Sequence, residues 1–148
     1  MNAPVDLGRR IGYQLKKLDT ALRAEMEAAL RPHGLGVTQY ACLELLDQQP
    51  GLSNAELARG AFVTRQAMNV VLRGLQDDGL VHRADTADHG RARPATLTSA
   101  GRARLTSGRH AVLAVEARML AGFDADRAEA LLTDLDAMAA ALRGTRAE

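Results

Sequence analysis

The fold is decided by the stretch LSNAELARGAFVTRQAMNVVLRGLQDDGLVHRADTADHGRARPATLT, residues Leu52–Thr98. It opens with Ser53-Asn54-Ala55-Glu56, the S-x-x-E pattern of a capping box. In that pattern the serine and glutamate side chains satisfy free backbone amides at the start of a helix. Gly60 is expected to make a turn, and Thr64 is a typical N-cap for a second helix that ends near Asp78.

The second helix of this stretch divides into an apolar and a polar face. The apolar stripe has helical spacing and consists of Met68, Val71, Leu72 and Leu75. The opposite side carries Arg65, Gln66, Asn69 and Arg73. Arginine can make paired hydrogen bonds with guanine, and asparagine or glutamine with adenine. The polar face is therefore predicted to enter a DNA major groove; a merely solvated helix face is the alternative interpretation.

Each residue at this surface has an expected role. Arg65, Gln66 and Asn69 are predicted to read bases, and Arg73 to lie toward the phosphate backbone. Thr64 and the turn before it are predicted to contact phosphate. If these roles hold, half-sites on the DNA lie about 10 bp apart between centres, one helical turn.

Two short strands are predicted after this helix, Leu80–Arg83 and Ala95–Thr98. The loop between them has a length typical of the wing of a winged helix-turn-helix. Arg91 and Arg93 in this loop are expected to reach a minor groove or adjacent phosphates. The fold class predicted is mainly α with a small β component, a winged helix-turn-helix between long terminal helices.

Composition limits the class of protein further. The chain has 148 residues, enough for one domain with a core, and its core must be aliphatic because only 3% of the residues are aromatic. No apolar run reaches the roughly 18 residues of a membrane span, and the N-terminus lacks the apolar segment of a secretory signal. A single cysteine, Cys42, fits a reducing compartment. A soluble, cytoplasmic, mostly helical protein is expected.

The net charge of +1 conceals an uneven distribution along the chain. Residues 1–58 carry six basic and seven acidic side chains, and residues 110–148 carry four and seven. Residues 59–109 carry nine basic and four acidic side chains, so the positive excess lies in the middle segment. A local basic surface in a nearly neutral protein favours a polyanionic partner such as double-stranded DNA.

The flanking segments are predicted to be dimerisation helices, at about 7–31 and 99–143, around a core at about 35–98. Apolar residues recur at helical spacing in both; they are Ile11, Leu15, Leu18 and Leu22, and then Leu131, Leu132, Leu135, Met138 and Leu142. The N-terminal seam fits an intramolecular core or a second subunit. The two C-terminal helices carry more apolar surface than a winged helix needs to cover itself, so an obligate homodimer is expected.

Several short motifs in fixed order resemble the MarR (multiple antibiotic resistance regulator) family. They are Gly34-Leu35, Gln39-Tyr40 and Leu43; Leu75, Gly79-Leu80-Val81 and Arg83; and Leu97-Thr98 with Gly101. The flanking helices match as well, so the resemblance covers nearly all of residues 1–148 as a single domain. In the wing, Arg91 matches the family's arginine, whereas the aspartate is displaced by one place to Asp88.

The resemblance implies a triangular homodimer that binds a palindromic operator, usually as a repressor. Many such proteins release DNA when a small anionic or phenolic ligand binds. The polar-tipped candidates for that effector pocket are Tyr13, His33 and Tyr40. No cofactor is implied.

Three alternatives are weighed against this function. A metal-responsive regulator of the same fold would use a ligand set such as His33, Cys42, Glu44 and His110, but the long helix has no His pair at i, i+4, and no metal site is predicted. A winged-helix protein-interaction module is disfavoured by the Arg/Asn/Gln face. An enzyme is disfavoured because no nucleophile elbow, P-loop, dinucleotide turn or HExxH motif is present.

Overall fold

The computed structural model describes residues 3–84 and 94–146. The helices and strands are η1 (Leu7–Arg9), α1 (Ile11–Leu30), η2 (Arg31–His33), α2 (Val37–Gln48), α3 (Asn54–Gly60), α4 (Arg65–Asp77), β1 (Val81–Arg83), β2 (Ala95–Leu97), α5 (Ser99–Met119) and α6 (Ala125–Arg146). The predicted winged helix-turn-helix is confirmed. The chain forms two compact units that meet within α5, one up to Leu113 and one from Ala114. The domain boundaries given above stay predictions.

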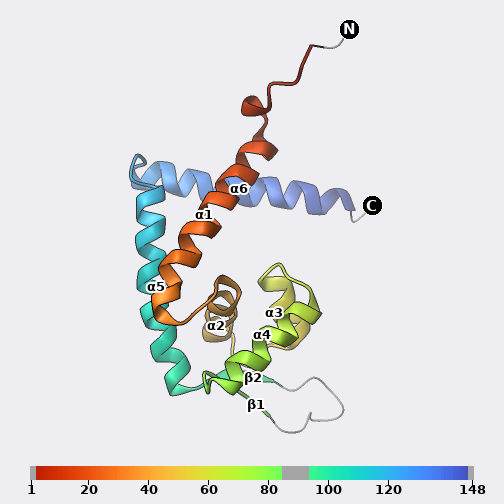
Figure 1. Ribbon diagram of the computed structural model, residues 1–148. Helices are drawn as coiled ribbons and strands as arrows, with labels where there is room; N and C mark the ends of the chain where they lie inside the picture. The colour runs from red at the N-terminus through yellow and green to blue at the C-terminus, as the bar shows by residue number, and fades with distance from the viewer. Residues whose placement is uncertain (1–2, 85–93, 147–148) are drawn as a thin grey trace. The chain divides into compact units, whose positions relative to one another are not determined.

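The first unit holds the core, which packs α2, α3, α4 and the two-stranded sheet together (Figure 1). The core consists of aliphatic side chains with one thiol: Leu30, Leu35, Cys42, Leu43, Leu46, Leu57, Ala58, Met68, Leu72, Leu75, Leu80, Val81, Ala95 and Leu105. The strands are antiparallel, with Val81 opposite Leu97 and Arg83 opposite Ala95. This core fixes α4 on the outside of the lobe by its apolar stripe.

Polar side chains cap helix starts at three places, and the caps at Ser53 and Thr64 are the ones predicted. The Ser53–Glu56 capping box forms, the Thr64 hydroxyl accepts from the Ala67 amide at 3.0 Å, and Asp124 accepts from the Arg127 amide at 2.8 Å. Helix α2 begins at Val37 with Gly36 as its N-cap, although the neighbouring Thr38 is of a residue type that often caps helices. There the Gln39 side chain accepts from the Gly36 amide at 2.8 Å and takes over the capping role.

The turn between α3 and α4 differs from the prediction. Gly60 is still helical, and Phe62 is the residue with a left-handed backbone, at φ 59°. The Phe62 amide donates to Arg59 and the Val63 amide to Ala58, the two bonds of a Schellman motif. Glycine at 60 has a packing reason instead, since a Cβ there would lie 2.9 Å from Cδ1 of Leu45.

Hydrogen bonds of Thr98 hold the start of α5 against the residues that lead into β1. The Thr98 hydroxyl donates to the Gly79 carbonyl at 2.7 Å and accepts from the Gly101 amide at 3.0 Å. The Thr98 amide donates to the Leu80 carbonyl at 3.1 Å. A Cβ on Gly101 would lie 2.0 Å from that same carbonyl oxygen, so this position admits no side chain. The junction explains why threonine and glycine occur together in the Leu97–Gly101 motif.

The terminal helices leave apolar side chains in solvent. In α1, which Arg10 separates from η1, Ile11 is 65% exposed, and Leu15 and Leu18 are also exposed. In α6 the exposed set comprises Leu131, Leu132, Leu135, Met138 and Leu142. Neither stripe is an intramolecular core in the described chain. No helix among residues 3–84 and 94–146 is long and apolar enough to cross a membrane.

Candidate nucleic-acid interface

Helix α4 presents a clear division between packed and free side chains. Met68, Leu72 and Leu75 are fully buried, with exposed fractions of 1% or less. All four predicted DNA-facing side chains of the helix, namely Arg65, Gln66, Asn69 and Arg73, are exposed. The structure therefore brings these four residues together on one surface, although their contacts with DNA stay a prediction.

Thr64 supports this surface rather than extending it. Its hydroxyl oxygen is occupied by the Ala67 amide, one of the amides that a helix start leaves without an internal partner. The hydroxyl proton remains available to a phosphate oxygen, and the N-terminal end of α4 carries the positive end of the helix dipole. The cap fixes the first turn, from which Arg65 and Gln66 project.

Asn69 has a partner that the sequence did not indicate. Nδ2 of Asn54, the first residue of α3, donates a hydrogen bond to Oδ1 of Asn69 (15 residues later). This bond joins the two helices of the motif and orients the Asn69 amide, leaving its Nδ2 group for an outside acceptor. Asn54 is thus a positioning residue, which sequence reasoning missed because it had assigned the segment only to helix capping.

Phe62 is a second residue that sequence reasoning missed. Its ring is 94% exposed, in the turn two residues before Thr64. An exposed aromatic side chain with positive φ is not explained by core packing or by backbone preference. The signal available in the sequence was a lone phenylalanine in a turn where glycine is usual.

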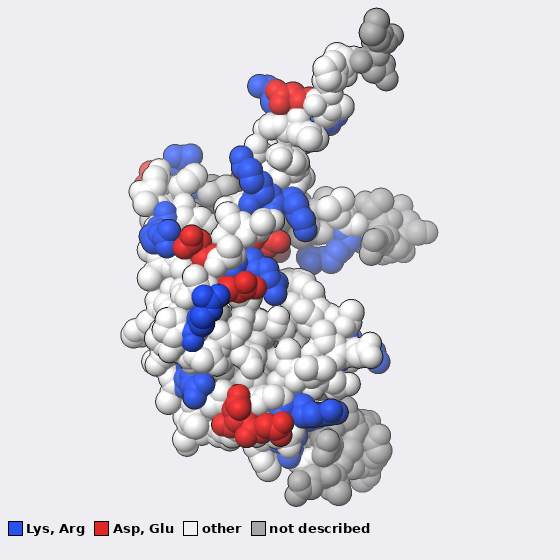
Figure 2. Space-filling view, viewed as in Figure 1, with Lys and Arg blue, Asp and Glu red and all other residues white. Residues whose placement is uncertain are grey.

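The strands that carry the wing are described, whereas the wing itself is not. The Ala84 amide donates to the Pro94 carbonyl at 3.3 Å, so the loop leaves and re-enters at adjacent positions. Arg91 and Arg93, together with Asp88, lie outside the described residues, and their roles stay predictions. Basic and acidic side chains are interspersed over the face drawn in Figure 2, without one continuous basic stripe.

Two of the three residues predicted for an effector pocket line separate hollows in the described part of the chain. Tyr13 lines a hollow of about 370 Å³ on α1 with Lys16 and Lys17. His33 lines another hollow, of about 600 Å³, which is also lined by the cationic side chain of Arg104 in α5. Tyr40 lines neither of them, and the prediction that the three bind an effector stays a prediction.

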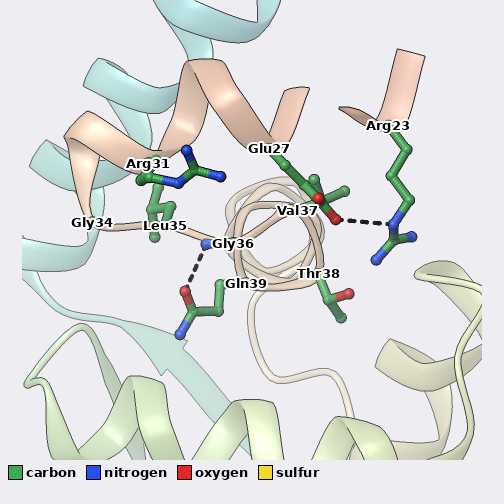
Figure 3. A pocket seen from close by; sticks show the side chains of 9 residues that line it. All are labelled: Arg23, Glu27, Arg31, Gly34, Leu35, Gly36, Val37, Thr38 and Gln39. Atoms are coloured by element: carbon green, nitrogen blue, oxygen red, sulfur yellow. Dashed lines mark hydrogen bonds and ion pairs between the residues drawn. The ribbon is translucent and has the colours of Figure 1, made fainter. Parts of the chain in front are cut away.

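A further hollow of about 550 Å³ lies between the end of α1 and the start of α2 (Figure 3). Arg23 on its wall is paired with Glu27 at 3.2 Å. The Arg31 side chain points into the same region, and its guanidinium has no hydrogen-bond or ion-pair partner in the part of the chain described (Figure 3). This hollow and the His33–Arg104 hollow meet at Gly34.

Tyr40 belongs to a polar cluster that joins α2 to α5. Its hydroxyl donates to Oε1 of Glu44 at 3.1 Å, and Arg109 reaches the same oxygen at 2.7 Å and Asp47 at 2.9 Å. Burial, reinforced by the Glu44 charge, raises the pKa of Tyr40 to about 12. Hydrogen bonds from Arg109 to the two carboxylates raise the pKa of its guanidinium further. Arg109 is thereby committed to packing two helices together.

Cys42 is buried in the core. Burial raises the pKa of its thiol to about 12, so the thiolate that binds metals or reacts with oxidants is disfavoured. Glu44, a second member of the alternative metal set, is occupied by Tyr40 and Arg109. Among residues 3–84 and 94–146 no three His, Cys, Asp or Glu side chains cluster in a way that could hold a metal ion.

Comparison with known proteins identifies the family to which the chain is similar. Residues 33–92 match the sequence profile of the MarR family. The HTH-type transcriptional repressor Rv2887 of Mycobacterium tuberculosis is 50% identical over 111 residues, which span 75% of this chain and 80% of that protein. A crystal structure of Rv2887 in complex with salicylic acid is 44% identical, with a TM-score of 0.72, and covers 93% of this chain and 97% of that one. Its complex with DNA is 42% identical, has the same TM-score of 0.72, and covers 93% of this chain and 98% of that one.

A helix-turn-helix with two short strands beside an exposed Arg/Asn/Gln face defines a winged-helix DNA-binding protein. Within that class, this chain belongs to the MarR family. It is a DNA-binding transcriptional regulator, as are its relatives.

Proposed function

We propose that the protein is a homodimeric repressor, which binds a palindromic operator in the cytoplasm and acts by binding rather than by catalysis. The observation that carries this proposal is α4. Its apolar stripe is buried, while Arg65, Gln66, Asn69 and Arg73 are exposed on the opposite face. The side chains suited to base edges are thus available on a helix whose first turn is fixed by Thr64.

A homodimer accounts for the exposed apolar stripes of α1 and α6. A stable interface buries roughly 800 Å² on each partner and has an apolar centre, which charged and polar helix surfaces do not supply. The stripe Leu131, Leu135, Met138 and Leu142 has the four- and three-residue spacing of a helix that packs on another helix. Two copies paired in this way would present two α4 helices to two half-sites.

We further propose that an aromatic carboxylate of the salicylate type releases the operator. Rv2887 has been crystallised with salicylic acid, and its sequence is related to this chain over most of its length. The hollow lined by His33 and Arg104 offers an imidazole and a cation to such an anion. Arg104 has no hydrogen-bond or ion-pair partner among the described residues, so its guanidinium is available. By linkage, the ligand weakens DNA binding only as far as it prefers the state of the protein that fits the operator poorly.

The test is release of operator DNA by salicylate, followed by fluorescence anisotropy. Wild-type protein is expected to bind a duplex from its own promoter region and to lose it as salicylate is added. Arg104→Gln is expected to raise the salicylate concentration for half-release about tenfold, because a charge-assisted hydrogen bond to the carboxylate is lost.

Arg23→Gln is the matched control, since Arg23 lies in the neighbouring hollow and is already paired with Glu27. It is expected to leave the half-release concentration within about twofold. If Arg104→Gln leaves the half-release concentration of salicylate unchanged, the ligand does not bind in the His33–Arg104 hollow. The same conclusion follows if Arg23→Gln changes that concentration and Arg104→Gln does not. A protein that binds no operator DNA at all contradicts the regulator function itself.

A further inference from the structure

One large apolar side chain stands on the DNA-facing side of α4. Val70 is 69% exposed, whereas Met68, Leu72 and Leu75 on the other side are buried. With 3.6 residues per turn, Val70 lies about 40° around the helix from Gln66 and about 60° from Arg73. Val70 therefore lies at the edge of the exposed face that carries Gln66, Asn69 and Arg73.

Neither packing nor helix stability explains a valine at this position. Its side chain is outside the core, so it contributes nothing to the stripe that holds α4 in place. Valine is also a weaker helix former than alanine, lysine, glutamate or glutamine, the residues that usually occupy exposed helix positions. An exposed β-branched side chain in mid-helix is available for contact with a partner.

The position identifies what that partner must offer. Val70 is the sixth residue of α4 and belongs to its N-terminal half, the part of a recognition helix that reaches base edges. Arg65 precedes Val70 along the helix axis and Arg73 follows it, so a helix placed in the groove by these two side chains would bring Val70 to the groove as well. Most groups that line the major groove are hydrogen-bond donors or acceptors, and the thymine C5-methyl is the apolar exception.

We infer that Val70 is a specificity-determining residue that packs against a thymine methyl in each operator half-site. The inference rests on the proposed function, because it needs α4 in the major groove. The stiff, branched side chain has a fixed χ1 in a helix, so its methyl groups present a shaped surface at little entropic cost. Gln66 and Arg73 would then supply hydrogen bonds on either side of an apolar contact.

The test removes one methyl group from the DNA rather than from the protein. The full-length protein first selects its half-site from a random duplex library. Each thymine of the selected site is then replaced by uracil in both half-sites, which deletes the methyl and leaves base pairing unchanged. At one thymine position the replacement is expected to weaken binding about fourfold per half-site, which is the value of one buried methyl group. Replacement in both half-sites together is expected to weaken it about fifteenfold.

The same titrations with Val70→Ala assign the effect to Val70. The variant is expected to bind the thymine and uracil duplexes equally, since the methyl has lost its contact. Val71→Ala makes the same chemical change on the half-buried side of α4 and is expected to keep the wild-type thymine preference. Helical content measured by circular dichroism shows whether each variant is folded.

The possible outcomes distinguish failure of the Val70 inference from failure of the proposed function. A selected site in which no thymine responds to uracil overturns the inference, and this result needs no variant protein. A thymine preference that survives in folded Val70→Ala also overturns it. Failure of wild-type protein to select any sequence contradicts the proposed function instead.

Discussion

Gly101→Ala is expected to lower the free energy of unfolding by about 3 kcal/mol or more, at the upper end of the cost of overpacking. The added Cβ would lie 2.0 Å from the Leu80 carbonyl oxygen, a distance at which either α5 or β1 must move. Movement would also break the Thr98 bonds to Gly79 and Leu80, which hold the sheet against α5. Urea unfolding followed by circular dichroism measures the loss.

Gly74→Ala is the matched control for this experiment. Gly74 is also helical, and a Cβ there would meet no atom within 4 Å. Alanine is a better helix former than glycine, so this variant is expected to gain about 0.5–1 kcal/mol. A Gly101→Ala protein as stable as wild type would show that the junction of β1 and α5 is not packed as described.

Leu135→Glu is expected to convert the protein to a monomer and to reduce operator affinity about 10²–10⁴-fold. Leu135 lies in the middle of the exposed α6 stripe, and a charge there cannot be buried in an apolar interface without a large desolvation cost. The affinity falls because a dimer with two α4 helices binds a palindrome far more tightly than a monomer with one α4 helix binds a half-site. Light scattering gives the mass in solution, and a gel shift gives the affinity.

Thr133→Glu provides the comparison. Thr133 is exposed on the opposite side of the same helix, about 160° from Leu135 by helical geometry. This variant is expected to remain dimeric and to bind the operator like wild type. If Leu135→Glu is also dimeric, α6 does not form the interface; if it is monomeric but binds as tightly as wild type, dimerisation is not what gives operator affinity.

Local chemistry made much of the fold predictable from the sequence. Ser53, Thr64 and Asp124 cap helices because short polar side chains reach nearby amides, a contact that depends only on neighbouring residues. The stripe of α4 was equally clear, since a helix with one buried face must place apolar residues three and four apart. The exposed Arg/Asn/Gln face followed from the same periodicity.

The features that could not be predicted from the sequence depend on contacts between distant parts of the chain, or on a backbone conformation that is unfavourable for the residue that adopts it. Asn54 contacts Asn69 only because α3 and α4 pack together. Phe62 takes the left-handed position of the turn, which residue-type preference alone would give to a glycine. His33 meets Arg104 through the packing of α5, which no spacing in the sequence reveals.

The central claim is that the exposed face of α4 reads the bases of the operator. The most direct measurement compares Gln66→Ala, Asn69→Ala and the control Gln48→Ala, titrated by anisotropy against the selected operator and against unrelated DNA. Gln48 is an exposed residue at the end of α2, remote from α4 in the sequence.

Each of the two α4 variants is expected to lose about 1–3 kcal/mol of binding free energy per half-site on the operator and to bind unrelated DNA like wild type. Gln48→Ala is expected to match wild type on both duplexes. Variants of Gln66 and Asn69 that keep the full preference for the operator over unrelated DNA would contradict the claim.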